Sequence, residues 1–228
     1  IRRADCVVAL SDFTLNELAR FHPRSIDKTV RVYPGVHRTF QAGPKADEVV
    51  LRAHRVDSAY ILAMGNIHPR KNLSCLLDAY LHLRKHRSSI PKMVWVGAPR
   101  WGSGELLERA RSAGVVLTGF VAQEDLPAFY RGATMLVYPS LYEGFGLPPA
   151  EAMACGTPVV TSNTTSLPEV VGQAALTVDP TDLEALSGAM GRLLDDAALR
   201  KELSEAGIKR AQRYTWARTA RELLAALQ

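Results

Sequence analysis

The 228 residues are 47% hydrophobic and 22% charged, which is ordinary globular composition. No apolar run reaches the roughly 18 residues of a membrane-spanning helix, and the apolar run at the N-terminus is too short for the core of a signal peptide. The net charge of +5 favours anionic partners such as nucleotides, nucleic acid or anionic lipid, with a basic solvated surface as an equal alternative.

Short β-rich runs alternate with helical patterns along the chain. The predicted strands are residues 6–10, 29–33, 59–65, 92–97, 114–119, 134–139, 157–162 and 174–178. After residue 178 the pattern is wholly helical, with predicted helices at 181–194, 196–213 and 215–227. Continuous apolar strands separated by helices indicate a parallel sheet that is covered on both faces. The predicted fold is therefore α/β, a doubly wound parallel sheet of the Rossmann kind.

One predicted boundary interrupts this alternation. Residues 33–50 contain two prolines and two glycines and have no clear period, which is typical of a linker. The strand, helix and strand before it are too few for a domain. We therefore interpret 1–33 as the tail of a preceding domain that the sequence lacks, and 34–45 as the interdomain linker. Residues 46–214 would form the ligand-binding domain, followed by a C-terminal helix at 215–228.

The three cysteines, Cys6, Cys75 and Cys155, have neither disulfide nor zinc spacing. We interpret them as reduced and buried, in a protein of the cytosol.

The first candidate site follows the strand at 59–65. Gly65 permits a tight turn, and Arg70 and Lys71 then stand at or just before a helix N-terminus, where free amide groups favour an anion. Because positive side chains are locally unfavourable at that end of a helix, we favour a function for both, the neutralisation of a diphosphate. The alternative is that they are exposed residues at the start of a helix.

The second candidate site is the stretch EGFGLPPAE at 143–151. Gly144 and Gly146 allow the backbone to approach a ligand closely and can adopt a positive φ. The amides of 144–147 can point into a pocket. Pro148 and Pro149 suit the first turn of a helix. Glu151, inside that helix, can accept hydrogen bonds from the hydroxyls of a ribose. Glu143, on the loop, can hold sugar hydroxyls or a developing positive charge. Helix-dipole stabilisation and an exposed loop acid are the alternatives.

Two other strand ends are weaker candidates. Phe120 and Val121 are apolar where a loop is usually polar, so they either form one wall of a nucleobase slot or pack under the next helix. Gly97 and Ala98 are small enough to leave room for a ligand, and Trp101 either stacks on it or covers the sheet.

Other functions are disfavoured by what the sequence lacks. His82 and His86 have metal-ligand spacing but no third ligand, which favours a solvated helix face. There is no D-x-D triplet, no Walker motif of an ATPase and no G-x-S-x-G elbow of a hydrolase. We therefore expect neither a metal nor a cofactor. A nucleic-acid partner is also disfavoured, because no nucleic-acid-binding motif is present.

Three stretches together resemble the C-terminal half of retaining GT-B glycosyltransferases of family 4. They are MGNIHPRKNLSCLLDAY, the segment from TGFVAQEDL to SLPEVVG, and the closing RYTWARTARELL. The pair of glutamates eight apart around an inner G-F-G is the specific part of this match. The PRKN form is most similar to the bacterial mannosyltransferases of that family, and the match runs over about residues 30–225.

The resemblance implies a role for each matched position. Lys71 with Arg70 would bind the donor diphosphate, and Glu143 would hold the donor sugar, so these three are the expected catalytic residues. Many members carry an arginine where this chain has Asn66, and we expect Arg70 to replace that cation. The expected donor-binding residues are Gly65, Asn66, Gly97, Phe120, Val121, Gly144, Phe145, Gly146, Leu147 and Glu151.

The implied function is metal-independent transfer of a hexose, with mannose as the first candidate, from a GDP- or UDP-linked donor with retention of configuration. Such a reaction belongs to polysaccharide biosynthesis. The acceptor, a glycan or lipid-linked sugar, would bind the N-terminal domain, so we expect the chain alone to be inactive. A non-catalytic nucleotide-sugar-binding module is the alternative. The expected location is the cytoplasm, and peripheral association of the whole protein with the inner face of the membrane is left open.

Overall fold

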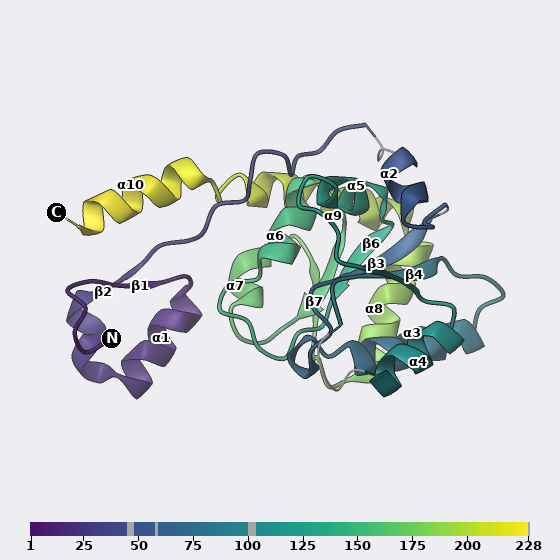
Figure 1. Ribbon diagram of the computed structural model, residues 1–228, viewed down its shortest axis with the longest axis horizontal. Helices are drawn as coiled ribbons and strands as arrows, with labels where there is room; N and C mark the ends of the chain where they lie inside the picture. The colour runs from purple at the N-terminus through teal and green to yellow at the C-terminus, as the bar shows by residue number, and fades with distance from the viewer. Residues whose placement is uncertain (45–47, 58, 100–103, 228) are drawn as a thin grey trace.

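The computed structural model describes residues 1–44, 48–57, 59–99 and 104–227. Figure 1 shows one large α/β unit and, beside it, a smaller group made of the N-terminal segment and the last helix. The large unit is built on a six-stranded sheet in the order β5-β4-β3-β6-β7-β8, and every neighbouring pair in it is parallel. The strands β1 and β2 form a separate parallel pair.

All the predicted strands are present, to within two residues at each end. They are β1 Val7–Ala9, β2 Thr29–Arg31, β3 Tyr60–Met64, β4 Lys92–Val96, β5 Val116–Gly119, β6 Met135–Tyr138, β7 Val159–Ser162 and β8 Leu176–Val178.

The helices lie between these strands and after the last of them. They are α1 Asp12–Phe21, α2 Glu48–Ala53, α3 Leu73–Lys85, α4 Gly104–Ser112, α5 Leu126–Gly132, α6 Leu147–Ala154, α7 Leu167–Val171, α8 Leu183–Asp195, α9 Ala197–Ala211 and α10 Trp216–Ala226. Two 3-10 helices, η1 Pro23–Lys28 and η2 Pro69–Lys71, complete the elements.

The central strands are buried on both faces. Along β3 the side chains alternate between two hydrophobic cores, because successive residues of a strand point to opposite faces. Leu62 packs in one core with Phe129 of α5, and Ile61 packs in the other with Leu76 of α3 and Leu193 of α8. Helices therefore cover both faces of the sheet (Figure 1), which confirms the predicted doubly wound α/β fold.

Two expectations need correction. The stretch 33–50 is not irregular to its end, because α2 begins at Glu48. Of the three cysteines, only Cys155 is buried, whereas Cys6 and Cys75 are half-buried. The predicted domain boundaries stay predictions.

The last helix leaves the large unit and lies beside the N-terminal segment (Figure 1). The hydroxyl of Thr219 in α10 donates to the carbonyl of Tyr33 at 2.7 Å. Just before α10, the chain pairs with residues 35–36: the amide of Val36 donates to the carbonyl of Tyr214 at 2.9 Å, and Val36 forms a parallel bridge with Thr215. The chain thus passes between the two groups of elements twice, and the two passages touch.

No helix within the described ranges has both the length and the apolar character that crossing a membrane requires.

Candidate functional site

The two strongest sequence motifs meet because their strands are neighbours. Lys71 follows β3, Glu143 follows β6, and these strands pair directly in the sheet. Parallel neighbours present their carboxyl ends at the same edge, which is where doubly wound sheets bind ligands. Arg70 and Lys71 lie in η2, just before α3 begins at Leu73, as predicted. The amide of Arg70 donates to Nδ1 of His68, which caps this turn.

Glu143 is the centre of a polar cluster. Four donors surround its Oε1: Nη1 of Arg70 at 2.6 Å, Nζ of Lys71 at 2.7 Å, Oγ of Ser140 at 2.7 Å and the hydroxyl of Tyr138 at 2.8 Å. Lys71 also donates to the hydroxyl of Tyr138. The side chains of Lys71 and Glu143 are only 12% and 11% exposed, whereas Arg70 is 40% exposed. Two cations thus share one anion in a largely buried place.

The pKa values of both buried partners are lowered, but for different reasons. Burial lowers the pKa of Lys71, which the charge of Arg70 reinforces and Glu143 opposes. Burial alone would raise the pKa of Glu143, but hydrogen bonds from Lys71, Arg70 and Ser140 outweigh it, so that pKa is lowered. Glu143 is held as a carboxylate by two cations, while Lys71 has only a share of one anion. The cluster is therefore short of negative charge, which favours an anionic ligand.

The loop from Glu143 to Leu147 turns its carbonyl groups toward the protein. The hydroxyl of Ser166 lies 2.9 and 2.8 Å from the carbonyl oxygens of Glu143 and Phe145. The carbonyl of Gly144 accepts hydrogen bonds from two hydroxyls of the N-terminal segment, and that of Gly146 accepts one from inside α6.

The amides of the same loop are left open. Within the described residues, no acceptor bonds the N–H groups of residues 144–147, which stand at the N-terminus of α6. Buried amides are normally paired, and a helix N-terminus with free amides attracts anions. Gly146 has a positive φ of 108°, as predicted. Pro148 and Pro149 lie in the first turn of α6, also as predicted. Gly144 does not have the positive φ expected of it.

Glu151 lies in α6, as expected, and is partly buried. Its Oε2 accepts a hydrogen bond from the hydroxyl of Tyr130 at 2.8 Å, and Tyr130 is completely buried. No hydrogen-bond partner of Oε1 is present among the residues the structure describes, so this oxygen can accept from a ligand hydroxyl. Burial raises the pKa of Glu151, which the Tyr130 hydrogen bond only partly opposes.

Replacing Glu151 with glutamine is expected to stabilise the folded protein at pH 7 by about 1 kcal/mol, the usual scale of one substitution. A carboxyl whose pKa is raised on folding stabilises the fold below its unfolded pKa and loses this contribution as the pH rises through the folded value. Glutamine keeps an acceptor for Tyr130 and removes the buried charge. Urea unfolding at pH 7 and pH 5 measures this gain, which should be smaller at pH 5. Glu202→Gln, an exposed change in α9, is the control, and an equal gain there contradicts the explanation.

Gly65 and Gly97, the glycines that follow β3 and β4, lie against each other. Gly65 has φ at 111°, and a Cβ there would lie 3.2 Å from Cε of Lys71. At Gly97 a Cβ would lie 2.1 Å from the carbonyl oxygen of Gly65, so its small size makes room for the neighbouring backbone, where we expected room for a ligand. Asn66 is exposed beside them.

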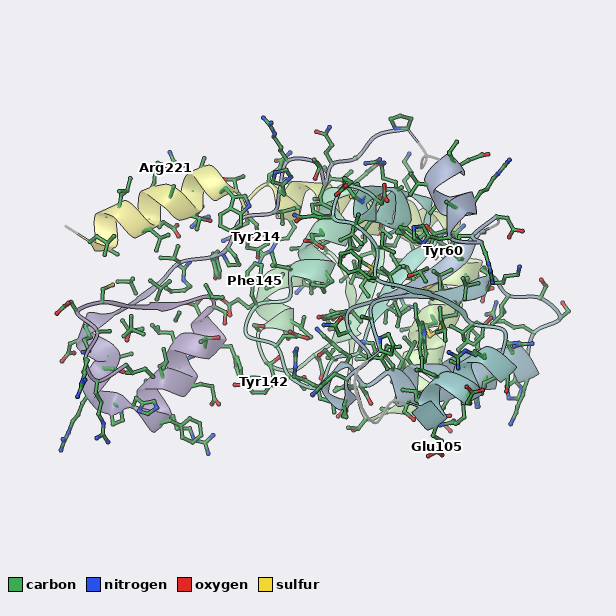
Figure 2. The ribbon with its side chains drawn as sticks, viewed as in Figure 1. Tyr60, Glu105, Tyr142, Phe145, Tyr214 and Arg221 are labelled. Atoms are coloured by element: carbon green, nitrogen blue, oxygen red, sulfur yellow. The ribbon has the colours of Figure 1, made fainter. Side chains whose placement is uncertain are left out.

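The two residues predicted to form a wall of a base slot differ in burial. Phe120 is 80% exposed just after β5, but Val121 is only 6% exposed and packs in the hydrophobic core. Only Phe120 therefore offers a side chain to a ligand. Trp101 lies outside the described residues. Leu147 is partly exposed at the start of α6, and Phe145 is buried beside Tyr214 (Figure 2).

Sequence reasoning missed the hydroxyl groups that shape the site. They belong to Ser11, Thr14, Tyr130, Tyr138, Ser140 and Ser166. A signal existed for Tyr138 and Ser140, because side chains two apart at a strand end share a face. No sequence signal indicated Ser11, because it lies 133 positions before Gly144 in the chain.

Comparisons with known proteins find a matching family model and several similar chains. The family model described as "Glycosyl transferases group 1" matches residues 58–196. The chain is 36% identical over 219 residues to O-antigen chain mannosyltransferase B of Escherichia coli, a match that covers 93% of this chain and 58% of that protein. Sucrose-phosphate synthase from Thermosynechococcus elongatus has 28% identity and a TM-score of 0.80, covering 98% of this chain and 59% of that one.

The Anabaena protein HepE, solved with UDP and glucose, is similar in fold alone. Its TM-score is 0.85 at 19% identity, and the match covers 99% of this chain and 63% of that one. This chain therefore spans less than two thirds of the length of each of these three proteins.

Proposed function

This chain belongs to the group 1 glycosyl transferases and has the Rossmann-like α/β fold of the C-terminal domain of GT-B enzymes, and from that premise we propose that it binds a nucleoside-diphosphate sugar. The observation that carries the proposal is the row of amides at 144–147, which have no acceptor in the described part of the chain and lie beside Lys71 and Arg70. Free amides and a cluster short of negative charge together suit a diphosphate.

The whole protein would transfer the sugar of this donor to an acceptor. As the bond between sugar and diphosphate breaks, negative charge builds up on the leaving phosphate. Lys71, Arg70 and the loop amides would stabilise that charge, and donors fixed before the reaction are the effective ones. Glu143 would orient the sugar through its Oε2, since four donors already surround Oε1.

Retention of configuration and membership of family 4 are parts of the same proposal. Glu143 is a weak base, because its pKa is lowered and its Oε1 is fully engaged. This fits a mechanism in which the acceptor attacks on the face of the leaving group and gives its proton to the leaving phosphate oxygen. Glu151 would hold the ribose through Oε1, and Phe120 would cover the base.

Mannose is the sugar we propose, with a GDP-linked donor first and a UDP-linked donor second. Several relatives of the chain are named mannosyltransferases, while HepE was solved with UDP. The acceptor would be a glycan or a lipid-linked sugar. We further propose that the reaction requires no metal.

Calorimetry of this chain with GDP-mannose, GDP, UDP and ADP tests the proposal. We expect GDP-mannose and GDP to bind, with the same affinity in EDTA as in Mg²⁺. Absence of binding by all four ligands contradicts the donor site, and binding only with a divalent metal contradicts metal independence. A transfer assay on the longer protein then separates an enzyme from a non-catalytic binding module.

A further inference from the structure

The N-terminus of α1 contacts the glycine loop directly. The hydroxyl of Ser11, which is completely buried, donates to the carbonyl of Gly144 at 2.7 Å. The hydroxyl of Thr14 donates to the same oxygen at 3.0 Å. Close by, the rings of Phe13 and Tyr142 meet edge to face with centroids 5.4 Å apart, and Figure 2 shows Tyr142 directed toward α1.

The amides at the start of α1 are all engaged, in contrast to those of α6. The amides of Asp12 and Phe13 donate to the carboxylate of Glu169 in α7, at 2.7 and 3.1 Å. The amide of Thr14 donates to the hydroxyl oxygen of Ser11, and the amide of Leu15 donates to the carbonyl oxygen of Ser11. With its first four N–H groups paired, α1 offers nothing to an anion. Its N-terminus is instead a docking element, held by α7 and by the loop.

This docking fixes the direction of a peptide group. In a trans peptide the C=O and the N–H point in opposite directions. The hydroxyls that hold the carbonyl of Gly144 on the side of α1 therefore aim the N–H of Phe145 away from α1. That N–H is one of the unpartnered amides of the loop. The ring of Phe145 is held as well, between Tyr33 and Tyr214, at 5.9 and 5.2 Å between centroids.

We propose that Ser11 and Thr14 are positioning residues for the diphosphate of the donor, which rests on the proposed function. They do not touch the ligand. They hold the peptide between Gly144 and Phe145 in the orientation that presents its N–H. Donor affinity then depends on the docking of α1, although α1 precedes the donor loop by more than 100 residues.

The test compares two variants with two controls. Thr14→Val removes one hydroxyl without changing the shape of the side chain, and Ser11→Ala with Thr14→Val removes both. Thr14→Ser keeps the hydroxyl, and Ser25→Ala removes a buried hydroxyl that bonds His22 in the same segment, away from the loop. Thermal unfolding shows which variants are folded. Because Ser11 also caps α1, Thr14→Val is the variant that isolates the loop contact.

Two measurements are made on each protein. The first is the ¹H–¹⁵N spectrum without ligand, in which we expect the amide signals of residues 144–147 to shift in both variants and in neither control. The second is calorimetry with GDP and UDP. Loss of one hydrogen bond changes an equilibrium constant by roughly two- to tenfold. We therefore expect the double variant to bind GDP and UDP about tenfold more weakly than the wild type, and Thr14→Val to lose less affinity.

The outcomes separate this inference from the proposed function. Unchanged amide signals in the double variant overturn the inference, and so does binding as tight as that of the wild type. Binding of neither nucleotide by the wild type overturns the proposed function, and this inference with it. If Ser25→Ala loses as much affinity as Thr14→Val, the role of Thr14 is merely structural, and this result also overturns the inference.

Discussion

Replacing Lys71 with methionine is expected to weaken the binding of GDP or UDP to this chain by roughly ten- to a hundredfold. Hydrogen bonds to charged groups contribute about 1.5–3 kcal/mol each, and Lys71 is the more buried of the two cations in the cluster. Methionine keeps an unbranched apolar chain in place of the lysine methylenes and removes the ammonium that lies over the ring of Tyr138. Glu143 keeps three donors, so the protein should remain folded.

Calorimetry measures this loss, and Lys85→Met is the matched control. Lys85 is exposed at the end of α3, so the two variants have the same net charge. Equal affinities in the wild type and in Lys71→Met are incompatible with a diphosphate on Lys71. Equal losses in both variants assign the effect to the long-range field of the protein.

Replacing Glu143 with glutamine should separate binding from turnover. The change frees Lys71 and Arg70 from their shared anion, so we expect GDP to bind at least as tightly as before. In the longer protein we expect transfer to slow by about a hundredfold or more, the scale of losing one group that stabilises a transition state. Calorimetry and a transfer assay measure the two effects, with the exposed Glu108→Gln as control. Unchanged turnover, or GDP binding lost together with turnover, contradicts the role of Glu143.

The same variant has an expected pH dependence. Because the pKa of Glu143 is lowered on folding, its contribution to stability is present above the unfolded pKa of 4.5 and disappears as the pH falls through the folded value. Glu143→Gln should therefore be less stable than the wild type at pH 7, and the difference should shrink below pH 4.5. A constant difference in the free energy of unfolding across this range shows that Glu143 is not stabilised as a carboxylate.

The fold could be predicted because its signals are local. Most strands are short runs of apolar residues, and many of the connections carry glycine or proline, so the positions of β1 to β8 follow from neighbouring residues. The position of Lys71 and Glu143 at one edge of the sheet agrees with the general rule that the carboxyl ends of parallel strands share an edge. That rule does not say which strands are neighbours, and the pairing of β3 with β6 came from the structure.

The predictions that were wrong concern contacts that no local sequence pattern indicates. Val121 and Phe120 look alike in sequence, yet one packs in the core and the other is exposed, because the end of β5 decides which side chain faces inward. Gly97 is small because the carbonyl of Gly65 lies against it, a contact between separate strands. The contact of Ser11 with Gly144 joins segments so distant in sequence that only the folded chain reveals it.

The paired passages of the chain beside α10 have a mechanical consequence. A Cβ on Gly35 would lie 2.3 Å from the backbone nitrogen of Trp216, so the two passages are in backbone contact, and the Val36 hydrogen bond fastens them together. A displacement of the N-terminal segment from the six-stranded sheet should therefore carry α10 with it, and it would break the contacts of Ser11 with Gly144 and of Glu169 with the start of α1. A movement that separated the N-terminal segment from α10 would break the Thr219–Tyr33 hydrogen bond.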